Sequence, residues 1–102
     1  MLNILIKEFL AVCAFLIKKK ARVHKGYLLV DKNYVCELLD KNKYETSTNK
    51  LKCWKELGWI DAEEKRLTKR IYDGETKKYL PYVKIDLKRY ECLKRLDGGQ
   101  TG

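Results

Sequence analysis

Apolar residues recur at helical spacing through the N-terminal part of the chain. The stripe consists of Leu5, Phe9, Val12 or Cys13, and Leu16, and it is widened by Ile6, Leu10 and Ile17. A stripe of this width is typical of a helix that is largely buried. The spacing therefore predicts a core helix over residues 3–21, and Gly26 then breaks the pattern.

The same stretch does not fit a membrane segment. Its apolar run is interrupted by Lys7 and Glu8 and is shorter than the roughly 20 residues that a span requires. A signal peptide carries its positive charges before the apolar run, whereas the three lysines at 18–20 follow it here. We therefore expect no membrane partner.

A second, shorter helix is predicted next. Residues 27–30 form a short strand or an extended entry, and Asp31 is a suitable N-cap for a helix over residues 32–40. The apolar face of this helix is formed by Val35, Leu38 and Leu39. The polar residues 40–43 then predict a turn, because Asp and Asn side chains compete for local backbone hydrogen bonds.

A third helix begins where Thr46 or Ser47 can cap it and ends at Gly58. Its buried face is expected to carry Leu51, Trp54 and Leu57.

The pattern changes from helical to alternating after Gly58. Alternating apolar positions are Leu67, Ile71, Val83, Ile85 and Leu87, which is the period of a strand. The pair Asp73-Gly74 predicts a two-residue hairpin turn, which would place Arg70 opposite Lys77 and Lys69 opposite Lys78. Pro81 has no ladder donor and belongs at an edge or a bulge.

Helical spacing returns at the C-terminus. One face carries Tyr90, Leu93 and Leu96, and Asp86 can cap this helix. Residues 97–102 have nothing to bury and are expected to be disordered. A chain of 102 residues is therefore expected to form one domain over residues 1–96.

The net charge of +9 indicates a polyanionic partner, because a domain this basic is attracted to polyanions. The stretch "TSTNKLKCWKELGWIDAEEKRLTKRIYDGETKKYLPYVKI" joins a polar helix start, an L-x-x-W-x-x-L-G-W-I ending and a charged hairpin. In this order of elements, residues 30–87 resemble a winged helix-turn-helix domain. The resemblance implies an α+β fold with a three-helix core, a two- or three-stranded β-hairpin wing and a C-terminal helix.

The resemblance also implies double-stranded DNA as the partner, and a role as a small transcriptional regulator or replication accessory protein of bacterial or mobile-element type. The third helix would enter the major groove, with Asn49 and Lys52 reaching bases or phosphates and Ser47 and Thr48 offering helix N-terminal N–H groups to phosphate. The candidate DNA-binding residues are Ser47, Thr48, Asn49, Lys50 and Lys52 on the helix and Lys69, Arg70, Lys77 and Lys78 on the hairpin.

Other interpretations stay open at this point. The same basic helix and wing could dock on an acidic protein partner, or the lysines could serve solubility alone. RNA is a weaker option, because no aromatic pair lies in a strand motif of the base-stacking kind. The apolar faces of the first and last helices are used within one subunit or across a two-fold axis, and we favour a homodimer.

The sequence carries no pattern typical of an enzyme. His24 lies in an expected loop, and Asp61, Glu63 and Glu64 form an expected solvated acidic patch. The four cysteines, Cys13, Cys36, Cys53 and Cys92, include no C-x-x-C pair. We therefore expect a cytoplasmic, non-enzymatic protein with reduced thiols, no metal ion and no cofactor.

Overall fold

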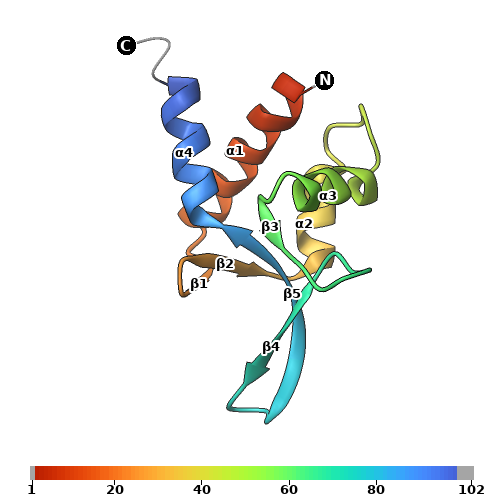
Figure 1. Cartoon of the computed structure of the whole chain (residues 1–102), viewed down its shortest axis with the longest axis vertical. Helices are drawn as coiled ribbons and strands as arrows, with labels where there is room; N and C mark the ends of the chain where they lie inside the picture. Colours follow the sequence, from red (N-terminus) through yellow and green to blue (C-terminus); the bar gives the residue numbers. More distant parts are fainter. Residues whose placement is uncertain (1, 99–102) are drawn as a thin grey trace.

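The chain is α+β. A computed structural model describes residues 2–98, which contain four helices and an antiparallel sheet (Figure 1). The elements, in chain order, are α1 (Leu2–Lys18), β1 (Arg22–His24), β2 (Tyr27–Val30), α2 (Lys32–Leu39), α3 (Ser47–Glu56), β3 (Ile60–Asp61), β4 (Lys69–Asp73), β5 (Lys78–Asp86) and α4 (Leu87–Gly98). Among these described residues, no helix has the length and apolar character needed to cross a lipid bilayer.

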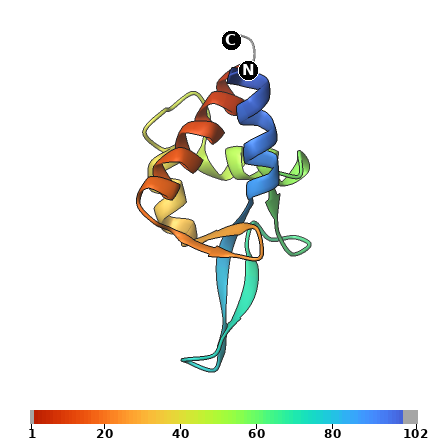
Figure 2. The ribbon, with the colours of Figure 1, turned by 90° about the vertical axis from the view of Figure 1, so that its left-hand side faces the viewer.

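Strand β5 organises the sheet. The strand order is β1-β2-β5-β3, and β4 pairs with β5 outside this path. The C-terminal half of β5 pairs with β2 and β3, whereas its N-terminal half pairs with β4 alone. The β4–β5 hairpin therefore projects from the body, as Figure 2 shows, and the molecule measures 47 × 27 × 24 Å. Pro81 lies in the half of β5 that has a single partner strand, which fits the expected edge position.

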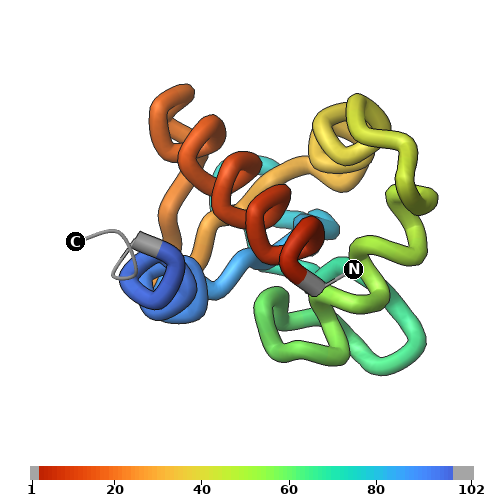
Figure 3. Tube along the Cα trace, turned by 90° about the horizontal axis from the view of Figure 1, so that it is seen from above, coloured from red at the N-terminus to blue at the C-terminus, as the bar shows by residue number. Residues whose placement is uncertain are grey.

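Helix α1 supplies much of the core, as its spacing predicts. Seen from above, it crosses the middle of the molecule between α4 on one side and α2 and α3 on the other (Figure 3). The ring of Phe9 lies 5.0 Å from that of Trp54 and 4.7 Å from that of Trp59, measured between centroids. The buried residues of α1 are Leu5, Phe9, Val12, Cys13 and Leu16, and the sheet contributes Leu28, Val30, Val83 and Ile85.

The predicted helix starts are confirmed. The Asp31 carboxylate accepts a hydrogen bond from the backbone N–H of Tyr34 at 3.2 Å, and α2 begins one residue after the cap. The Thr46 hydroxyl accepts from Asn49 N at 3.2 Å in the same way at α3. At α4, the Asp86 carboxylate accepts from the backbone N–H of the second helical residue at 2.9 Å.

The end of α3 explains how the chain passes from helix to sheet. Gly58 has a φ of +77°, its N–H donates to Lys55 O, and Trp59 N donates to Trp54 O at 2.8 Å. This is the left-handed Schellman ending that favours glycine. The predicted burial of Leu57 is wrong, because Leu57 is the cap residue and is 41% exposed. The turn brings Trp59 over the core instead.

The predicted loop around His24 is wrong. Strands β1 and β2 form a hairpin in which His24 pairs with Tyr27. Lys25 and Gly26 have φ values of 50° and 85°, and two positive φ angles are what a two-residue hairpin turn of type I′ requires. Helix α1 ends at Lys18, three residues before the predicted boundary at residue 21, and β1 begins at Arg22.

The predicted register of the second hairpin is also wrong. Asp73 pairs with Lys78 and Tyr72 with Tyr79, so the loop has four residues, 74–77, and neither predicted like-charge pair forms. The Asp73 carboxylate accepts from Glu75 N and from the Thr76 hydroxyl, and Lys77 N donates to Asp73 O at 2.8 Å. Lys77, with a φ of 59°, takes the left-handed position, so the Asp-Gly pair does not form the tight turn.

Helix α4 is longer than predicted. It continues to Gly98, so two residues of the expected tail are helical, and residues 99–102 lie outside the described part of the chain. Tyr90 is buried and Leu93 half-buried, whereas Leu96 is exposed, so the predicted apolar face is buried only near its start.

Candidate nucleic-acid interface

The exposed face of α3 agrees with the predicted helix register. Leu51 and Trp54 are fully buried, while Thr48, Asn49 and Lys52 are exposed. The core contacts of Trp54 therefore fix which side chains α3 presents to a partner.

The N-terminus of α3 is already occupied by side chains of the protein. The Glu45 carboxylate accepts from Thr46 N at 2.8 Å and from Asn49 Nδ2 at 3.1 Å. The bond from the backbone N–H of Thr46, followed by the one from Asn49, lowers the pKa of Glu45, so its negative charge stays at the helix start. A phosphate at Ser47 and Thr48 would meet this carboxylate, which disfavours the phosphate site expected there.

The predicted place of Lys50 on the exposed basic face is wrong. Lys50 is 1% exposed, and its Nζ donates to Glu8 Oε2 at 2.9 Å, to Leu39 O at 2.7 Å and to Asn42 O. Its ammonium also lies 4.2 Å from the centre of the Tyr44 ring. Lys50 precedes Trp54 by four residues, and this spacing places both on the same helix face.

A basic loop that contributes no predicted site residue lies beside α3. Lys55 Nζ donates to the backbone oxygens of Glu63 and Arg66 at 2.9 Å and 2.8 Å, which attaches the loop after β3 to the helix. The groove between helix and loop is lined by Lys52, Lys55, Glu56, Lys65, Arg66 and Leu67. Lys65 and Arg66 are exposed, so they extend the positive charge of Lys52. The Lys55 contacts hold this Lys-Arg pair beside the helix.

The base of the β4–β5 hairpin carries an ion pair. Arg70 Nη2 lies 2.9 Å from Glu63 Oε1, and Arg70 Nε donates to Glu63 Oε2 at 3.1 Å. The hydrogen bond from Arg70 lowers the pKa of Glu63, and the same bond raises the pKa of Arg70. Arg70 therefore already has an anionic partner.

The prediction that the acidic residues after α3 form a solvated patch is wrong for two of the three. Glu63 pairs with Arg70, and Asp61 Oδ2 lies 3.1 Å from Lys84 Nζ. Glu64 is exposed.

The remaining hairpin lysines lie at different positions along it. Lys69, at its base, is half-buried, whereas Lys77 and Lys78 are exposed at its tip. The tip lies at the opposite end of the molecule from the start of α1 and the end of α4 (Figure 1). The five residues of β4 span about 17 Å, which is roughly half of one ~34 Å turn of DNA.

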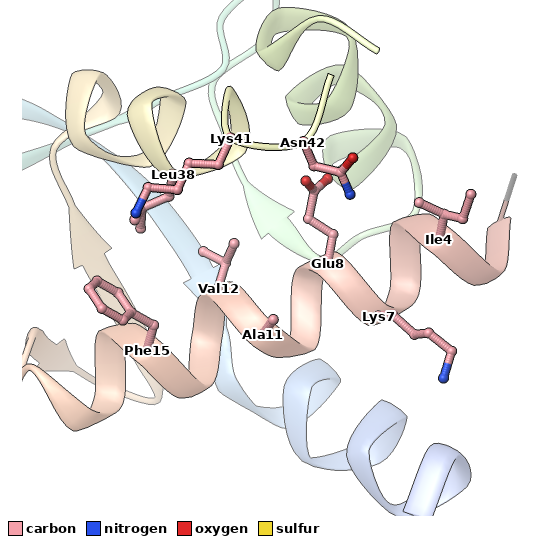
Figure 4. Close-up of a pocket in the computed structure, with 9 residues that line it drawn as sticks. All are labelled: Ile4, Lys7, Glu8, Ala11, Val12, Phe15, Leu38, Lys41 and Asn42. Carbon is pink, nitrogen blue, oxygen red and sulfur yellow. The ribbon is translucent and has the colours of Figure 1, made fainter. Parts of the chain in front are cut away.

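A separate groove lies between α1 and α2. Its lining is mainly apolar, with Glu8 pointing toward Asn42 at one side (Figure 4). The lining residues are Ile4, Lys7, Glu8, Ala11, Val12, Phe15, Leu38, Lys41 and Asn42. It contains none of the candidate DNA-binding residues.

All four cysteines are free thiols. Within residues 2–98, no group of three or more His, Cys, Asp and Glu side chains is arranged to hold a metal ion. The sequence matches no protein-family model and no curated protein. The interpretation of the site therefore rests on its geometry.

Proposed function

We propose that this protein is a winged helix-turn-helix DNA-binding module in which α3 enters the major groove and the β4–β5 hairpin contacts the flanking backbone. The elements run α1, β1, β2, α2, α3, β3 and the β4–β5 hairpin, so the three helices and the hairpin follow one another in the order that the resemblance implies, which supports the proposal. The module would serve a small transcriptional regulator or a replication accessory protein.

The observation that carries the proposal is the position of Lys52. It is exposed on α3, opposite the buried Trp54, and shares a groove with Lys65 and Arg66. A helix that presents Asn49 and Lys52 can offer donors to base edges, and the neighbouring basic loop can neutralise phosphates.

The alternative partner is an acidic protein that docks on the same basic surface. It predicts weak duplex binding at every salt concentration. DNA binding predicts an affinity that falls steeply with salt, since each neutralised phosphate releases counterions.

The test begins with selection of a preferred duplex from a random pool, which supplies the target sequence. Fluorescence anisotropy then compares the selected duplex with a scrambled one. We expect Lys52→Ala to reduce the discrimination between them by about 1–3 kcal/mol. Arg95→Ala removes one positive charge from the last turn of α4 and should leave the discrimination unchanged. A pool in which nothing is enriched would contradict the proposal.

A further inference from the structure

The projecting hairpin carries an exposed pair of tyrosines. Tyr72 of β4 lies directly opposite Tyr79 of β5, with ring centroids 5.3 Å apart and ring planes at 65°. The two residues are 52% and 67% exposed, and neither belongs to the core cluster. Two large rings therefore remain open to solvent on the part of the sheet that stands away from the body.

Charged side chains lie at both ends of this pair, with the Arg70–Glu63 ion pair at the base and two exposed lysines at the tip. Side chains of a strand alternate between faces, so Arg70 and Tyr72 share one face of β4, and Tyr79 and Pro81 share the same face of β5. A small hollow at the base of the pair is lined by Glu63, Arg70 and Tyr79. At the other end, Lys77 and Lys78 directly precede Tyr79 and are exposed, with Lys78 on the opposite face of β5 from Tyr79.

A cross-strand aromatic pair also stabilises its own hairpin, and that role accounts for the contact between the rings. It does not account for the exposure of more than half of each tyrosine, or for the exposed lysines at the hairpin tip. Exposed rings flanked by cations are how proteins hold single-stranded nucleic acid, because every base has a face that stacks and every phosphate a charge to neutralise.

We propose that Tyr72 and Tyr79 form a stacking platform for unpaired nucleotides, so that the hairpin binds a single strand that leaves the duplex held by α3. This inference rests on the proposed function for its duplex part. The stacking part rests on the hairpin alone. A protein partner that is rich in acidic residues is the competing occupant, and the experiment separates the two.

The experiment compares a blunt duplex, the same duplex with a short pyrimidine overhang that contains one 2-aminopurine, and the free single strand. A second overhang made of RNA distinguishes the two kinds of strand. We expect tighter binding to the overhang duplex than to the blunt one, and quenching of the 2-aminopurine as it stacks. Removal of an aromatic platform typically costs 1–3 kcal/mol per base, so Tyr72→Ala with Tyr79→Ala should weaken overhang binding about 5- to 140-fold.

Three variants control for damage to the hairpin. The pair Tyr72→Phe with Tyr79→Phe keeps the rings and should bind like the natural protein. The pair Tyr72→Leu with Tyr79→Leu keeps an apolar cross-strand contact without the π faces, and should lose the overhang gain while blunt-duplex affinity is kept. Tyr34→Ala removes an exposed tyrosine from α2 and should change nothing.

The outcomes are distinct for the two proposals. Equal affinity for overhang and blunt duplex, or an equal loss for both in the leucine variant, overturns the stacking platform and leaves duplex binding intact. Tyrosine-dependent binding to the single strand without duplex binding supports the platform and contradicts the proposed function. Absence of all nucleic-acid binding overturns both.

Discussion

Lys50 Nζ donates to Glu8 Oε2 over 2.9 Å, and this bond joins α3 to α1 across a separation of 42 residues. The side chains are 0% and 8% exposed, so the ion pair lies inside the protein. The other Glu8 oxygen accepts from the Tyr44 hydroxyl at 2.6 Å, and the backbone oxygens of Leu39 and Asn42 accept from Lys50. The three donors of the ammonium and both carboxylate oxygens are thus satisfied. The network fixes the turn between α2 and α3 against α1, and with it the orientation of α3.

Lys50→Met should destabilise the protein by about 3–5 kcal/mol, because it leaves the Glu8 carboxylate buried without its cation. The double change Glu8→Leu with Lys50→Met should cost less than the sum of the single changes, since no unpaired charge remains. Urea denaturation of the three variants measures these free energies of unfolding. Additive losses in the double variant would mean that the ion pair is not coupled.

Trp54→Ala should cost about 3–5 kcal/mol, because a large ring is removed from between α1 and α3 and a cavity remains. Lys52→Ala, on the opposite face of the same helix, should change stability by less than about 0.5 kcal/mol. Denaturant midpoints at constant m-value give the change in the free energy of unfolding for each variant. A larger loss for Lys52→Ala would reverse the assignment of the exposed face.

Lys77→Ala with Lys78→Ala should weaken binding to all duplexes alike and make the dependence of log affinity on log salt concentration shallower by about two units. Both lysines are exposed at the hairpin tip, where the proposed function expects them to meet backbone phosphates rather than base edges. Anisotropy titrations of one duplex at several salt concentrations measure the slope. An unchanged slope would show that the tip does not touch the duplex.

Glu63→Gln should raise duplex affinity at low salt and steepen the salt dependence by up to about one unit, because Arg70 then becomes available for a phosphate. The Arg70 side chain is 55% exposed, so loss of the ion pair should leave the free energy of unfolding nearly unchanged. Glu64→Gln is the matched control, because it removes the same charge from the same loop without releasing Arg70. Equal effects of the two changes would mean that each carboxylate lowers duplex affinity by repelling phosphates, and would contradict the release of Arg70.

Cys92 should react with a thiol reagent in the folded protein, whereas Cys13 should react only after unfolding. Cys92 is exposed, while burial raises the pKa of Cys13 above its ordinary value of 9.0 and keeps its thiol protonated. Because the folded pKa is the higher one, the contribution of Cys13 to stability should fall as pH rises above about 9. Mass spectrometry after timed alkylation reports the order, and rapid labelling of Cys13 would contradict it.

Local physical chemistry made several parts of the fold predictable. A cap depends on a side chain and an N–H three residues away, so Asp31 and Thr46 could be assigned from the sequence. Gly58 could be assigned because a left-handed helix ending favours glycine wherever the rest of the chain lies. The burial of Leu51 and Trp54 and the exposure of Asn49 and Lys52 followed from the period of α3, whereas the positions of Lys50 and Leu57 did not.

The candidate site was only partly predictable, because its charges are shared with residues that are distant or take an unexpected register. The sequence alone shows Arg70 as a free cation, whereas the structure pairs it with Glu63. It also suggests a tight Asp73-Gly74 turn, whereas the Asp73 carboxylate organises a longer loop and brings Tyr72 opposite Tyr79.

The sequence by itself determined where the helices start, where α3 stops and which of its faces carries Asn49 and Lys52, because these features depend on neighbours within a few residues. Only the tertiary structure decided that Lys50 is buried against Glu8, and that Lys65 and Arg66 lie beside α3. The sequence alone does not decide whether a lysine is buried, because burial requires a carboxylate from another element within hydrogen-bond distance of the ammonium group. For Lys50 that carboxylate is supplied by the packing of α1 across the other helices, which no local sequence pattern encodes.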